Sequence, residues 1–177
     1  MSKVKGYFKF CPRCGRRLTR RRDWRNEPIR WSCPTKHFSF YNNPVTANEA
    51  LIIRGQRLLM VIRAAKPKKG FLDLPGGFIE GFEDPTRSVV REIKEELGVR
   101  FTPQQLLVAH ADPYRWHGRN IPVTILTYVG SIRGTPRQSG EVARVLWVPL
   151  SRLPTKRLAF PHLRASFRAL KRYLRSR

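Results

Sequence analysis

Six of the twelve acidic residues fall within seventeen positions, and these carboxylates are the first candidates for chemistry. They are Glu80, Glu83, Asp84, Glu92, Glu95 and Glu96, in a chain with 36 Lys and Arg and a formal charge of +24. At 100° per residue of a helix, Glu92, Glu95 and Glu96 fall on one arc, where like charges repel. Oxygen ligands are those that hard divalent cations prefer. The cluster therefore predicts a divalent-metal site.

Local signals around this cluster predict a glycine turn followed by a helix. Gly76 and Gly77 let the backbone approach a ligand closely. Asp84 and Pro85 suit the N-cap and the first position of a helix, and Gly98 suits the left-handed residue after its last turn. A helix N-terminus beside carboxylates and a backbone carbonyl favours metal-bound phosphate.

The spacing of the segment resembles the complete signature of the Nudix hydrolases. Gly77 is followed after five residues by Glu83, and after seven more by the run from Arg91 to Val99. The flanks "LPGGF" and "RVLWVPLSRLP" are also similar, so the resemblance covers residues 41–155. It implies an α/β fold, the Nudix αβα sandwich. It also implies hydrolysis, by water with bound Mg²⁺ or Mn²⁺, of a nucleoside diphosphate linked to another moiety, of nucleotide-sugar, ADP-ribose or dinucleotide type.

Carried over position by position, the resemblance also implies roles. Glu92, Glu95 and Glu96 become ligands of Mg²⁺ or Mn²⁺, together with the Gly77 carbonyl. The ion pair of Glu83 with Arg91 holds the loop and the helix in place. Two carboxylates compete as the base that accepts the proton of water: Glu92, and Glu141, a lone acid where the family often has one. Glu141 can alternatively serve as an auxiliary ligand of the cation.

Three cysteines near the N-terminus indicate a second metal site. Cys11 and Cys14 form a C-x-x-C pair, and Cys33 follows after eighteen residues, which nearly fits a zinc ribbon. Lys36 occupies the place of the fourth cysteine, and His37 can complete a Cys₃His site. The alternative is a ribbon that packs without zinc. With the adjoining "YNNPVTANEALII", the module resembles NADH pyrophosphatase relatives, but the chain lacks their SQPWPFP element, so we do not expect their dinucleotide preference to carry over.

A segment beyond the acidic helix is a candidate for substrate binding. Tyr114, Arg115 and Trp116 stand in a predicted loop after a strand, where aromatic rings can stack on a base and arginine can hold phosphate. The alternative is that the two aromatic rings only pack beneath the loop.

The elements that position these residues divide into three parts. Residues 1–40 form a small zinc-ribbon-like module, residues 41–155 the Nudix domain, and residues 156–177 a basic amphipathic helix packed on that domain. A hairpin turn is expected at Arg54-Gly55-Gln56, and strands are expected over "QLLVAHAD", "IPVTILTYVG" and "EVARVLWVPL".

The charge favours anionic partners. One alternative substrate is therefore the 5′ cap of an RNA, and another reading is a basic nucleic-acid-binding Nudix protein without turnover. The chain has no apolar run suited to a signal peptide or a membrane span, and its odd number of cysteines suits a reducing compartment. We expect a cytoplasmic protein without membrane contact, and the family resemblance leaves a homodimer open.

Overall fold

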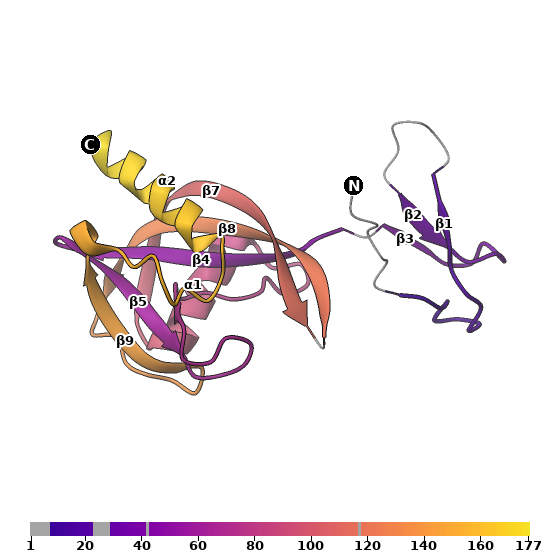
Figure 1. The fold of residues 1–177 in the computed structure, drawn as a ribbon, viewed down its shortest axis with the longest axis horizontal. Helices are drawn as coiled ribbons and strands as arrows, with labels where there is room; N and C mark the ends of the chain where they lie inside the picture. Colours follow the sequence, from indigo (N-terminus) through magenta and orange to yellow (C-terminus); the bar gives the residue numbers. More distant parts are fainter. Residues whose placement is uncertain (1–7, 23–28, 42, 117) are drawn as a thin grey trace. The chain divides into compact units, whose positions relative to one another are not determined.

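The computed structural model describes residues 8–22, 29–41, 43–116 and 118–177, and the side chains of Trp116 and Arg119 lie outside that description. The chain forms two compact units, Met1–Pro44 and Val45–Arg177, which are described separately (Figure 1).

The N-terminal unit contains a three-stranded antiparallel sheet in the order β1-β2-β3. Its strands are β1 Thr19–Arg21, β2 Arg30–Ser32 and β3 Ser39–Tyr41. The buried core consists of Cys11, Leu18 and Cys33, against which three partly buried aromatic side chains pack. So small an apolar core contributes little stability, which is why such units usually need a disulfide or a metal ion.

The larger unit contains six strands joined in one mixed sheet. The path runs β6-β5-β4-β8-β7, and β9 pairs with β5; β4 and β8 are parallel and the other pairs antiparallel. The strands are β4 Val45–Arg54, β5 Arg57–Arg63, β6 Leu72–Asp73, β7 Arg100–Trp116, β8 Arg119–Arg133 and β9 Val142–Pro149. The expected hairpin is present, because Arg54 pairs with Arg57 across Gly55-Gln56.

Two helices cover opposite faces of this sheet. Helix α1 (Pro85–Leu97) packs its Val89, Ile93 and Leu97 against Ala50 and Ile52 of β4. Helix α2 (Leu163–Arg175) packs its Leu163, Phe167 and Leu170 against Leu51 of β4, whose side chain points to the other face. A short 3₁₀ helix, Leu150–Arg152, follows β9. The layers are helix, sheet, helix (Figure 1), and the predicted αβα sandwich is confirmed.

The ends of α1 follow the local signals in the sequence. The Asp84 carboxylate accepts hydrogen bonds from the backbone N–H groups of Thr86 and Arg87, at 2.8 and 3.1 Å. Gly98 has φ 67° and donates its N–H to the Lys94 carbonyl. These caps fix where α1, which carries Glu92, Glu95 and Glu96, begins and ends.

The segment predicted as a substrate loop is instead a strand. Strand β7 continues to Trp116 because Pro113, Tyr114 and Arg115 pair with Pro122, Ile121 and Asn120 of β8. The prediction of a loop was wrong there: the polar and proline residues that suggested it occupy the far end of a long hairpin. Among the described residues, no helix is long and apolar enough to cross a membrane.

Candidate active site

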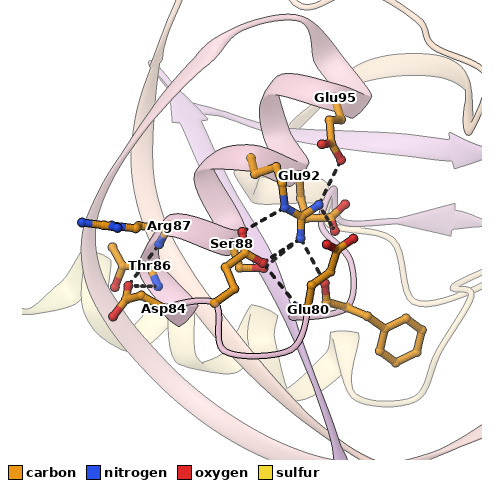
Figure 2. A network of polar contacts seen from close by, with 10 residues as sticks. Glu80, Asp84, Thr86, Arg87, Ser88, Glu92 and Glu95 are labelled. Atoms are coloured by element: carbon orange, nitrogen blue, oxygen red, sulfur yellow. Dashed lines mark hydrogen bonds and ion pairs between the residues drawn. The ribbon is translucent and has the colours of Figure 1, made fainter.

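Arg91 donates to three carboxylates at the acidic helix and is the centre of a polar network there. Figure 2 shows this network, with Glu92 and Glu95 on the helix and Glu80 on the loop before it. The Nε and Nη2 atoms of Arg91 donate to the two oxygens of Glu83, both at 2.9 Å. Nη1 donates to Glu92 at 2.9 Å and to Glu95 at 3.0 Å. Nη2 also reaches the Phe78 carbonyl at 3.3 Å. One guanidinium therefore connects the loop before α1 to the two helical glutamates, in the fork geometry that arginine offers to carboxylates.

The ion pair of Glu83 with Arg91 keeps both groups charged. The hydrogen bonds from Arg91 lower the pKa of Glu83 to about 2. The bonds to Glu83 and Glu92 raise the pKa of Arg91 in turn. The pairing predicted for these two residues is present.

Glu96 is the most perturbed carboxyl group of the acidic helix. Burial, and then the charges of Glu92, Asp73 and Glu141, raise its pKa to about 8, although the N–H of Gly76 donates to it at 2.9 Å. In the absence of a cation this group holds a proton at neutral pH. A carboxyl group kept in a costly environment is typical of functional sites.

Gly77 leaves room for the Glu92 carboxylate. A Cβ built on Gly77 would lie 2.5 Å from Glu92 Oε2, so only glycine allows this approach. The Gly77 carbonyl accepts the N–H of Asn48 at 2.8 Å and keeps its second lone pair. Burial raises the pKa of Glu92 in spite of its bond to Arg91. Two carboxyl groups, each with a raised pKa, thus lie against the glycine turn.

The other two candidate carboxylates are more accessible. The Glu95 side chain is 57% exposed, which suits a ligand that meets a substrate from solvent. Glu141 is exposed just before β9, where its carbonyl accepts the N–H of Ala64 at 2.9 Å. Its charge raises the pKa of both Glu92 and Glu96, which places its carboxylate within electrostatic reach of them.

Sequence reasoning missed the buried neighbours of the site. Asp73 binds Arg63 at 2.8 Å, yet burial raises its pKa to about 6, and its charge acts on Glu96. The backbone of Asn48 lies against the glycine turn, and its side-chain amide is buried with both polar atoms lacking a hydrogen-bond partner within the described residues. An aspartate between two leucines in "FLDLPGG" was the available signal for Asp73. Asn48 gave none.

Two of the three predicted substrate residues can be placed. Tyr114 packs its ring edge-on to Phe78, at 5.4 Å between centroids, and beside Phe160, at 5.6 Å. Arg91 donates to the backbone carbonyl of Phe78, so Phe78 connects Tyr114 to the acidic network. Arg115 is exposed and lines a cavity described below. The side chain of Trp116 lies outside the described residues.

The predicted zinc ligands converge in the N-terminal unit. The ligand atoms of Cys11, Cys14, Cys33 and His37 all lie within 4.8 Å of one another. Cys11 Sγ is 3.7 Å from His37 Nδ1, and Cys14 Sγ is 3.6 Å from Cys33 Sγ. A hydrogen bond with Thr35 lowers the pKa of the Cys33 thiol to about 7. Lys36 adopts a φ of 61°, and this tight turn brings His37 back towards the thiols.

The αβα layers and the glutamate-bearing helix beside a glycine turn define a protein of the Nudix class. The chain belongs to the NUDIX family, because the model of the NUDIX domain matches residues 44–170. The expectation of a Nudix pyrophosphohydrolase is thereby confirmed at the level of enzyme class.

Individual relatives agree with this placement. An ADP-ribose pyrophosphatase of Methanocaldococcus jannaschii is 32% identical over 127 residues, which span 72% of this chain and 73% of the relative. The crystal structure of a NUDIX hydrolase from Nitrosomonas europaea superposes with a TM-score of 0.74 and 25% identity, covering 96% of this chain and 92% of that one. A MutT NUDIX hydrolase from Burkholderia pseudomallei gives a TM-score of 0.64 and 27% identity, covering 72% and 98%.

Proposed function

We propose that the protein hydrolyses a nucleoside diphosphate linked to another moiety, and that ADP-ribose is the first substrate to test. The observation that carries the proposal is the pair of glutamates with raised pKa, Glu92 and Glu96, held against Gly76 and Gly77. The ADP-ribose pyrophosphatase of similar sequence supports the choice of substrate.

The donor set fits Mg²⁺ or Mn²⁺, because every candidate ligand is an oxygen. Glu92, Glu95, Glu96 and the Gly77 carbonyl would hold the cation, and the space that glycine leaves at position 77 supports this assignment. A bound divalent cation neutralises the diphosphate and lowers the pKa of coordinated water. The chain itself then has to orient the carboxylates, which Arg91 does through its bonds to Glu83, Glu92 and Glu95.

The proton of the attacking water has two candidate acceptors. Glu92 lies within the network, whereas Glu141 is exposed and free to approach a substrate. Because Glu92 is also a proposed metal ligand, the pH profiles of Glu92→Gln and Glu141→Gln are compared at saturating Mg²⁺. The variant of the base loses the acidic limb of the profile, and the other variant keeps it.

A panel of diphosphates tests the reaction. ADP-ribose, several nucleotide sugars and NADH are incubated with Mg²⁺ or Mn²⁺, and the products are separated by chromatography. We expect AMP and ribose 5-phosphate from ADP-ribose. A folded, metal-supplied protein that cleaves none of these compounds would contradict the proposal.

We further propose that Cys11, Cys14, Cys33 and His37 bind one structural zinc ion. The separations of 3.6 and 3.7 Å between ligand atoms suit a tetrahedral site, and the donor set is that of Cys₃His zinc modules. Thr35 Oγ1 lies 2.6 Å from His37 Nε2 and can orient the ring so that Nδ1 faces the thiols.

Metal analysis of matched variants tests the zinc proposal. Wild-type protein should contain one zinc ion per chain. His37→Ala should lose zinc, whereas Lys36→Gly, which suits the φ of 61°, should retain it. Equal zinc content in the two variants would remove His37 from the site.

The 5′ end of an RNA stays the alternative substrate. It is supported by the charge of the N-terminal unit, whose described residues include nine Lys and Arg and no acid: Lys9, Arg13, Arg16, Arg17, Arg20, Arg21, Arg22, Arg30 and Lys36. Binding through phosphates weakens steeply with salt. A capped oligonucleotide should therefore be cleaved faster than the free cap nucleotide at low salt only; no preference at low salt would exclude this substrate. The other alternative, a basic nucleic-acid-binding protein without turnover, is disfavoured because the full set of mutually repelling glutamates is present.

A further inference from the structure

A cavity in the larger unit, apart from the acidic helix, is lined by cations. It has a volume of about 470 Å³ and is enclosed by the loop after β5, the end of β7 and the segment that leads into α2. Five of its twelve lining residues are Lys or Arg and none is Asp or Glu. The five are Lys68, Arg115, Lys156, Arg157 and Arg164.

These cations have no carboxylate partner in the part of the chain that the structure describes. Arg157 and Arg164 instead donate to the backbone carbonyls of Gly70 and Thr155, at 3.4 and 3.3 Å. Lys68 lies over the ring of Phe71 at 5.3 Å. Neutral carbonyls and a ring position these three cationic groups but leave their charge uncompensated.

The nearby carboxylates are already engaged elsewhere. Asp112, next to the cavity residue Pro113, accepts from His162 at 3.0 Å. Asp73 accepts from Arg63 at 2.8 Å. Five like charges around one hollow repel each other, and an anion of high charge density is the ligand that offsets this repulsion.

A row of three aromatic side chains, the aromatic wall, leads from the cavity towards the acidic helix. Phe160 lines the cavity and packs beside Tyr114, which contacts Phe78 next to Arg91. The Phe160 ring is also stacked with His162 at 5.7 Å, and Arg63 lies 5.4 Å from its centroid. Because its ring is occupied by these contacts, Phe160 only lines the cavity. The cations are therefore the groups that can bind a ligand there.

We propose that this cavity binds a phosphate group distinct from the diphosphate at the acidic helix. The phosphate belongs either to the same substrate, as a monoester on its nucleoside, or to a free anion that occupies the cavity independently. The first case rests on the proposed function, because it extends the substrate from a nucleoside diphosphate to a phosphorylated one.

Equilibrium binding separates this inference from catalysis. Glu96→Gln protein, which we expect to bind nucleotides without turnover, is titrated by calorimetry with ADP-ribose, with ADP-ribose 2′-phosphate and with inorganic pyrophosphate. The titrations are repeated in two double variants that remove equal charge. Lys156→Ala/Arg164→Ala empties the cavity of two cations, and Lys171→Ala/Arg172→Ala removes two exposed cations of α2 that do not line it.

We expect ADP-ribose 2′-phosphate to bind about tenfold more tightly than ADP-ribose, because charged hydrogen bonds to phosphate are among the stronger ones. Lys156→Ala/Arg164→Ala should abolish that preference and leave the affinity for ADP-ribose unchanged, whereas the control pair should retain the preference. If only the affinity for pyrophosphate depends on the cavity cations, the phosphate that the cavity binds is a free anion and not part of the substrate. Two results would overturn the proposal. One is an equal loss of affinity in both double variants, and the other is that removing the cavity cations changes the affinity for neither ADP-ribose 2′-phosphate nor pyrophosphate. Because the experiment measures binding, its result is valid even if wild-type protein hydrolyses neither nucleotide.

Discussion

Replacing Glu96 by Gln should stabilise the metal-free protein while removing its activity. Burial and neighbouring carboxylates raise the pKa of Glu96 from 4.5 to about 8. The folded state therefore loses stability as pH rises from the lower value to the higher one. Since one pKa unit corresponds to about 1.4 kcal/mol, this rise in pKa sets an upper limit of roughly 4 kcal/mol at pH 8. Gln removes the charge and can still accept the Gly76 N–H.

Structural relaxation reduces that limit, so we expect a gain of about 2 kcal/mol at pH 8 and a rise in Tm of about 5 to 8 °C. Thermal unfolding of wild type and Glu96→Gln at pH 8 and pH 5, both without divalent cations, measures the effect. Most of the gain should disappear at pH 5, where wild-type Glu96 is protonated in the folded state. A variant as stable as wild type at both pH values would refute the assignment of a carboxyl group with a raised pKa at position 96.

Two further predictions concern the glycine turn and the N-terminal end of α2. Gly77→Ala should lose activity with little change in Tm, because the three atoms nearest to its methyl group all belong to the movable Glu92 carboxylate. Gly76→Ala should lower Tm by several degrees, because its methyl group meets the backbone of Asn48 at a φ of 145°; equal Tm losses in the two variants would contradict the difference. His162→Ala should destabilise the fold by about 3 kcal/mol at pH 6, since it removes the charged partner of buried Glu49 at 3.0 Å and leaves only the hydroxyls of Thr127 and Ser166. Although burial alone would lower the pKa of His162, its bonds to Glu49 and Asp112 raise it above 6.5. The destabilisation in denaturant titrations should therefore shrink as pH rises through that raised value, and a pH-independent loss would exclude an imidazolium at this position.

The features that the sequence predicts well are those determined by neighbouring residues. The caps of α1 depend on Asp84, Pro85 and Gly98, which act within one helical turn, and the structure has all three in the expected roles. The hairpin after β4 is equally local. The Cys₃His cluster follows from spacing, together with the tight turn at Lys36.

The features that the sequence does not predict bring distant residues together. Glu49 contacts His162, 113 positions further along the chain, and the buried imidazole links β4 to the N-terminal end of α2. The aromatic wall joins Phe78, Tyr114 and Phe160 from three separate segments. The extension of β7 also depends on pairing with β8, which overrides the loop signals of Pro113 and its polar neighbours.

The most direct test of the metal-dependent mechanism is the rate of diphosphate hydrolysis as a function of Mg²⁺ concentration in three proteins. These are wild type, Glu96→Gln and Glu80→Gln, which removes an exposed acid of the same segment, each with the panel compound that wild type cleaves fastest. We predict saturable Mg²⁺ dependence for wild type and Glu80→Gln, and a loss on the order of a hundredfold or more for Glu96→Gln. Turnover by Glu96→Gln at the wild-type rate and the same Mg²⁺ concentration would contradict a catalytic metal site at the acidic helix.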